Sequence, residues 1–162
     1  MNATDVIRST IDMSAMFVDT YLKDLSDADL LIRPVEGMNH IAWQLGHLIG
    51  SERHFVELIK PGTSPALPPG FQEAHAKGTH AEDDPSKFYP RERYQELWGA
   101  QRRATLALLE SLSDEDLDRT DETFPSFAPT VGAIMNMVGS HPIMHVGQFV
   151  AVRRKLGKPI TI

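Results

Sequence analysis

The chain of 162 residues contains no cysteine. This absence excludes disulfide bonds, cysteine nucleophiles and cysteine-bound zinc within the chain. No apolar run approaches the roughly 20 residues that a membrane-spanning helix requires. The first segment, MNATDVIRST, lacks the basic and apolar regions of a secretory signal. We therefore expect a cytoplasmic protein with no membrane partner.

Positive charge is also scarce. The chain has 16 lysines and arginines against 22 aspartates and glutamates, which gives a net charge of −6. Binding to nucleic-acid phosphates requires clustered basic side chains. The one basic cluster, Arg153 to Lys155 with Lys158 nearby, falls at the end of the last expected helix. Positive charge at that position complements the helix dipole. We therefore expect no nucleic-acid partner.

Four long segments repeat their apolar residues with the period of a helix, and none alternates with period two. Asn39 is a good N-cap for the second segment. The expected helices cover residues 7–25, 39–60, 91–112 and 130–156. The pattern predicts an all-α chain, a four-helix bundle forming one domain over residues 1–162.

Two features organise these helices. The hexamer Leu25–Leu30 recurs as Leu112–Leu117, and each copy carries a Ser-x-x-Asp sequence that can cap a short helical turn. This repeat predicts two helical hairpins of similar design.

Residues 61–89 are rich in proline, glycine and charge and show no period. We interpret them as the long crossover between helices 2 and 3 that parallel neighbours require, partly covering a site.

Histidines are concentrated on two of the expected helices. His141 and His145 are four residues apart, so their Cβ atoms would lie about 5–6 Å apart on one helix face. A buried imidazole without a partner costs about 1–3 kcal/mol, and one shared metal ion would satisfy both rings. His40, His47 and His54 recur every seven residues beside the apolar face of the second helix, and each can meet the pair. The alternative for His40 and His54 is a partly exposed position on the flank of that helix. Three imidazoles with an open fourth position are typical of catalytic zinc.

Glu52 lies within the apolar stripe of the second helix, where a carboxylate must be hydrogen-bonded or paired. It could orient a ligating imidazole, act as a general base, or pair with an arginine of another helix.

Pro142 directly follows His141 and removes the backbone hydrogen bond to the Val138 carbonyl. Either the helix kinks there or a new helix begins at Pro142, and a break would displace His141.

The histidine motifs resemble those of a known family. The segment NHIAWQLGHLIGSE, from Asn39 to Glu52, is similar to the second-helix signature of DinB-like proteins, with Gly-His-Leu and a Glu five residues after the His. HPIMHVGQ, from His141 to Gln148, followed by LGKP ending at Pro159, resembles the fourth-helix signature. The crossover, with LPPGF leading to Gly78, is also similar, so the resemblance covers nearly the whole chain.

This resemblance implies a four-helix bundle in which a divalent metal is held by one histidine of the second helix and two of the fourth. By position these are His47, His141 and His145, which selects His47 over His40 and His54. The family includes metal-dependent S-transferases that use low-molecular-weight thiols such as bacillithiol, and an isomerase that uses mycothiol. The resemblance therefore implies a metal-dependent thiol S-transferase with a small-molecule substrate and a low-molecular-weight thiol cofactor.

Three imidazoles accept several metals, and we expect zinc first and nickel second. We also expect a homodimer, from the resemblance and from Trp43 and Met144, two apolar residues that fall off the predicted core stripes and are therefore expected to be exposed. Two alternative functions stay open. One is a metal-dependent hydrolase with Glu52 as base, and the other is a non-catalytic, dimeric metal-binding module.

Overall fold

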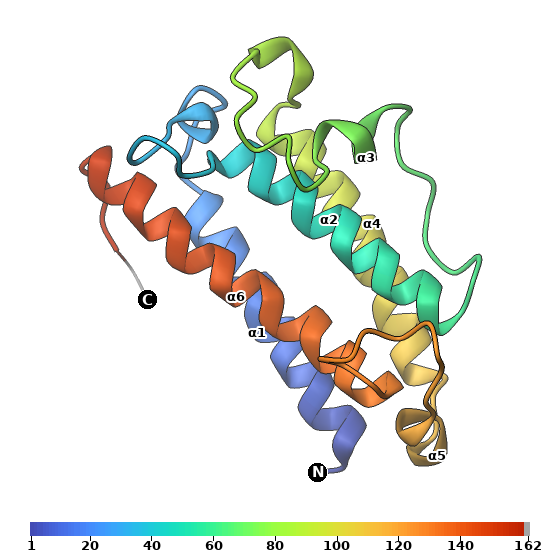
Figure 1. Cartoon of the computed structure of the whole chain (residues 1–162). Coiled ribbons are helices and arrows are strands. Elements are labelled where there is room, and N and C mark those ends of the chain that lie inside the picture. Colours follow the sequence, from blue (N-terminus) through green and yellow to red (C-terminus); the bar gives the residue numbers. More distant parts are fainter. Residues whose placement is uncertain (161–162) are drawn as a thin grey trace.

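The computed structural model describes residues 1–160, and helices dominate it (Figure 1). Within these residues, β-pairing is limited to an isolated bridge between Thr120 and Thr130. The elements are α1 (Ala3–Leu22), η1 (Asp29–Leu31), α2 (Ile41–Ile59), α3 (Phe71–Ala74), η2 (Pro85–Lys87), α4 (Arg91–Glu110), α5 (Asp114–Asp118) and α6 (Val131–Lys155). The four long helices confirm the predicted all-α bundle.

The long helices run in two parallel pairs. In Figure 1, α1 and α6 lie side by side and point the same way, while α2 and α4 point the opposite way. Helix α6 packs against both α1 and α2, and α4 contacts both α2 and α1. Because α2 and α4 are parallel, the chain must return along the bundle between them. Residues 60–90 make that return, as the predicted crossover.

Side-chain caps set where the elements begin. The two repeated hexamers form matching turns, because Ser26 and Asp29 exchange hydrogen bonds in the same way as Ser113 and Asp116. Helix α6 begins after Thr130, as expected, with the threonine hydroxyl accepting from the amide of residue 133 at 3.1 Å. These contacts satisfy amides that the first helical turn leaves without a partner.

Helix α2 begins one residue later than predicted, because His40 and not Asn39 is its N-cap. The Nδ1 atom of His40 accepts from the amide of Trp43 at 3.1 Å, and its Nε2 donates to the Glu82 carbonyl at 3.1 Å. The expectation that His40 is a partly exposed flank residue is wrong, since its side chain is fully buried. It fastens the crossover to the start of α2.

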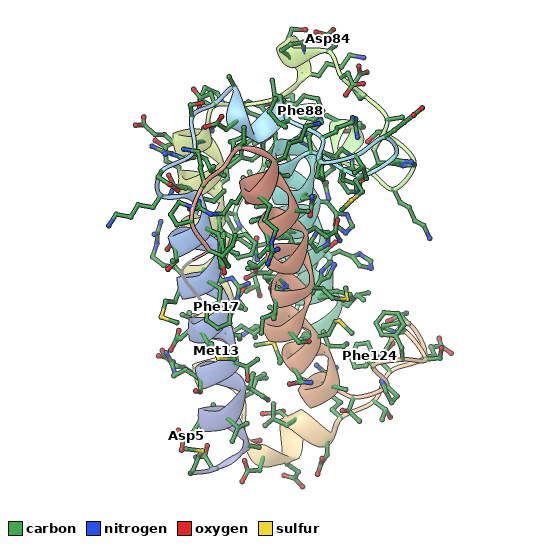
Figure 2. The ribbon with its side chains drawn as sticks, turned by 90° about the vertical axis from the view of Figure 1, so that its left-hand side faces the viewer. Asp5, Met13, Phe17, Asp84, Phe88 and Phe124 are labelled. Atoms are coloured by element: carbon green, nitrogen blue, oxygen red, sulfur yellow. The ribbon has the colours of Figure 1, made fainter. Side chains whose placement is uncertain are left out.

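The crossover also packs closely on the middle of α2. A Cβ atom at Gly46 would lie 2.1 Å from Cδ2 of His75, so the helix requires glycine at this position. The Nδ1 atom of His75 donates to the Phe71 carbonyl at 2.7 Å, and its Nε2 accepts from the Tyr94 hydroxyl at 2.8 Å. These bonds tie α3 to α4 and place the crossover beside His47. Figure 2 shows Asp84 and Phe88 of the crossover at the opposite end of the bundle from Asp5.

The core consists of two apolar clusters separated by a polar layer. One cluster extends along α2 to Ile49, and the other begins at Val56. Along every long helix, buried polar residues lie between the two clusters. They are Ser14 of α1, Glu52 of α2, Gln101, Arg102 and Thr105 of α4, and His145 of α6. The candidate site belongs to this layer.

Candidate metal centre

Three histidines from two helices meet in the polar layer. His47 projects from α2, and His141 and His145 project from α6. Each offers a ring nitrogen, and these atoms all lie within 4.8 Å of one another. The ring centroid of His47 is 5.3 Å from that of either partner, and the two α6 rings are 4.8 Å apart. The structure therefore brings together the three residues that the sequence singles out, while ligation itself stays a prediction.

The spacing of the two α6 rings fits metal ligands. Their Nε2 atoms are 3.2 Å apart. Two nitrogens each about 2.1 Å from a tetrahedral zinc ion would be about 3.4 Å apart. The Nδ1 atom of His145 donates to Oε1 of Gln44 at 2.8 Å, which leaves the Nε2 lone pair of His145 facing the other two rings. The Gln44 amide is itself fixed, because its Nε2 donates to the Asn39 carbonyl at 3.0 Å.

Gln44 thus orients an imidazole, which is one of the roles that the sequence allows for Glu52. The Glu52 carboxylate accepts from the Thr105 hydroxyl at 2.6 Å and lies 3.0 Å from Nε of Arg102. It pairs with an arginine of another helix, which was one of the three interpretations. The sequence does carry a signal for Gln44, since it precedes His47 by three residues and therefore lies about one turn away on the same helix.

Trp43 stacks on His47, with ring centroids 5.0 Å apart and planes 5° apart. Its Nε1 donates to the Thr79 hydroxyl of the crossover at 2.9 Å. The expectation that Trp43 is exposed is wrong, because only 5% of it is accessible. Met144 is 65% exposed, as expected. The homodimer stays a prediction, and of these two apolar residues Met144 alone supports it.

Helix α6 continues through Pro142, so the helix break considered from the sequence does not occur. The His141 ring therefore stays within reach of His145. The Val138 carbonyl, which has no amide donor at Pro142, accepts from Nη2 of Arg102 at 3.4 Å. Arg102 thus supplies a donor to the carbonyl that proline leaves without its usual helical partner.

The imidazoles are held in their neutral, metal-binding form. Burial, with a smaller contribution from the neighbouring rings, lowers the pKa of His145 to about 3 and that of His141 to about 4. Burial also lowers the pKa of His47. A buried site disfavours the charged form of a histidine, and only the neutral form has a lone pair for a metal.

These shifts predict that the metal-free protein loses stability in mild acid. The unfolded chain takes up protons near pH 6.5, whereas folded His145 and His141 resist protonation until about pH 3 and 4, so acidification favours unfolding. The free energy of unfolding should fall below pH 6.5 by about 1.4 kcal/mol per pH unit for each such imidazole. The lowered pKa values of His40, His47 and His75 act in the same direction. Urea titrations at pH 7, 6 and 5 measure the slope, which should be smaller in a His145→Asn variant. Equal slopes in the two proteins would contradict a buried, neutral His145.

A cavity of about 390 Å³ opens beside His47, between α2 and the crossover. Its α2 wall includes two glycines, and nothing lies within 4 Å of a Cβ atom placed on Gly50. The lining residues are Gly46, His47, Gly50, Ser51, His54, Phe55, Gln72, His75, Ala76 and Lys77. The cavity is wide enough for a small molecule to approach His47, and its lining includes a lysine and no acidic residue.

The fold and the site together place this protein in a class of helical bundles. Its four long helices form two parallel pairs, and a candidate metal site lies between α2 and α6. The sequence profile of the DinB superfamily matches residues 11–149, which include all three histidines, and the chain belongs to this superfamily. The predicted family is thereby confirmed.

A solved structure described as the conserved protein of a locus from Enterococcus faecalis has the same fold, with a TM-score of 0.72. It is 16% identical in sequence, and the match covers 98% of this chain and 99% of that one. No curated protein matches the chain significantly. None of the helices in residues 1–160 is both long and apolar enough to cross a membrane.

Proposed function

We propose that this protein binds one divalent metal through His47, His141 and His145 and transfers a low-molecular-weight thiol to a small electrophile. The observation that carries the proposal is the convergence of three neutral imidazoles, one of which, His47, lines an open cavity. When bound, the metal would lower the pKa of a coordinated thiol, so that the thiolate, the reactive form, is present at neutral pH.

Residues of the chain orient the imidazoles and enclose the cavity beside His47. Gln44 fixes the tautomer and orientation of His145, and Trp43 supports the ring of His47 by stacking on it. The crossover, held on α2 at Gly46, forms the opposite wall of the cavity. The absence of cysteine from the chain agrees with an external thiol.

Three imidazoles accept several divalent metals, and we propose zinc first and nickel second. The hydrolase considered from the sequence would use Glu52 as its base, and the Glu52 carboxylate instead contacts Thr105 and Arg102 of α4. We therefore prefer the transferase to the hydrolase.

The test combines metal analysis with a thiol panel. Protein purified without a metal-affinity step is assayed for bound metal, then for turnover of several electrophiles with and without added thiol. We expect about one metal per chain and turnover that requires both metal and thiol. Turnover without thiol would overturn the transferase, and metal binding without any turnover would favour a non-catalytic module.

A further inference from the structure

Because of Pro142, one backbone carbonyl of α6 has no donor within its own helix and accepts a hydrogen bond from another helix instead. Pro142 has no amide proton, so the carbonyl of Val138 lacks the donor that an unbroken helix would provide. The guanidinium of Arg102, from α4, donates to this carbonyl with Nη2 at a distance of 3.4 Å. Both Val138 and Arg102 are buried. A buried carbonyl without a donor is costly, so this contact stabilises the proline-containing turn.

Arg102 is held in place from several directions. Its Nε lies 3.0 Å from Oε2 of Glu52, and its guanidinium lies over the ring of Trp98, 4.4 Å from the centroid. Glu52 is fixed in turn by the hydroxyl of Thr105. These contacts span α2 and α4, so the position of the guanidinium is set by two helices other than α6.

The same turn of α6 is fixed on its other side by α1. A Cβ atom at Gly139 would lie 3.0 Å from Cγ2 of Thr10 and 3.2 Å from the backbone nitrogen of Ile11. The helices therefore approach closely at Gly139, and the turn between Val138 and Pro142 sits between α1 and Arg102. His141 belongs to this turn.

We propose that Arg102 is a positioning residue for the candidate metal centre. It replaces the helix donor lost at Pro142 and so fixes the backbone from which His141 reaches His47 and His145. The proposal rests on the proposed function for its metal readout. Glu52 then has a defined part in the same arrangement, because it anchors Arg102 without touching the imidazoles.

The experiment is a double-mutant cycle between Arg102 and Pro142. Glu52→Gln and Arg102→Met are made together, so that no buried charge is left without a partner. This pair of changes is placed in the natural chain and in a Pro142→Ala background, where residue 142 regains an N–H group for Val138. The readouts are Zn²⁺ affinity, the visible spectrum of bound Co²⁺, and the ring-nitrogen chemical shifts of His141 in the metal-free protein.

In the natural chain we expect a loss of Zn²⁺ affinity of about 10–100-fold, as for other groups that orient a ligand. The Co²⁺ spectrum and the His141 shift should change with it. In the Pro142→Ala background the same pair of changes should alter affinity by less than about threefold, because the backbone now supplies the donor. Equal losses in both backgrounds would assign Arg102 to general stability, and no loss in either would also overturn the proposal.

Two outcomes, an unfolded variant and a natural chain that binds no metal, need separate measurements. If the paired variant does not fold, Arg102→Lys replaces it, because an ammonium keeps the charge beside Glu52 but lacks the second nitrogen with which Arg102 contacts the Val138 carbonyl. If the natural chain binds neither Zn²⁺ nor Co²⁺, the proposed function fails. The His141 shift in the metal-free protein still decides whether Arg102 positions that ring.

Discussion

A His145→Ala variant should fail to bind the proposed metal while keeping its fold. His145 is the most buried of the three imidazoles, and its Nε2 lies 3.2 Å from that of His141. Without it, His47 and His141 are the only ligands that remain of the proposed three. The loss of affinity should exceed the roughly 10–100-fold that follows removal of a group orienting a ligand. Competition with a chelator measures affinity, and circular dichroism checks the fold.

Two variants calibrate this result. Gln44→Met removes the acceptor for His145 but no proposed ligand, so its loss should stay within about 10–100-fold. His54→Ala removes an exposed imidazole from the same helix as His47 and should leave metal affinity unchanged. If His145→Ala retains one tightly bound metal per chain, the three-histidine site is wrong.

The sequence predicts the helices, and the placing of His141 and His145 on one helix face, where a single periodic pattern carries the information. The apolar period of each helix and the spacing of His141 and His145 are local features, and the structure follows them. The choice of His47 from the three histidines of its helix came from the family resemblance. Periodicity alone could not make that choice, because His40, His47 and His54 all lie beside the same apolar face.

What the sequence could not show depends on contacts between distant segments. His40 is buried because the Glu82 carbonyl, in the crossover, accepts a hydrogen bond from its ring. Trp43 is buried by the same crossover through Thr79. A crossover without a period gives no indication of which helix face it covers, so both residues appeared more exposed than they are.

The alternatives left open for Glu52 and Pro142 have a common reason. Each residue places in the core a polar group that needs a partner. For Glu52 this group is its carboxylate, and for Pro142 it is the Val138 carbonyl, which lacks a donor. Arg102 meets both requirements from a third helix. Single-helix patterns show that such a requirement exists but not which residue satisfies it, because the partner is set by how the helices pack.

The second large effect is expected on stability, in a Glu52→Gln variant. Glu52 is 3% exposed, and burial raises the pKa of its carboxyl, while Arg102 and the Thr105 hydroxyl act against that rise. A neutral glutamine would leave the buried Arg102 charge without its counter-ion, which typically costs about 3–5 kcal/mol. The free energy of unfolding in urea should fall by that amount.

The paired change of Glu52→Gln with Arg102→Met is the control for this prediction. It removes both charges, so its stability should lie closer to that of the natural chain than the sum of the single changes would give. An additive result would mean that the two side chains do not interact.

Glu52→Gln also separates the two enzymatic models, once turnover is expressed per folded, metal-loaded chain. The carboxylate contacts α4 and does not touch the three imidazoles, so a transferase should keep turnover within about tenfold of the natural chain. A general base would be worth about 10²–10⁴-fold. Because the structural cost appears in the unfolding titration and the chemical cost appears in turnover, the two effects are measured independently. A loss of turnover in the general-base range, in protein that remains folded and loaded, would make Glu52 a base and restore the hydrolase.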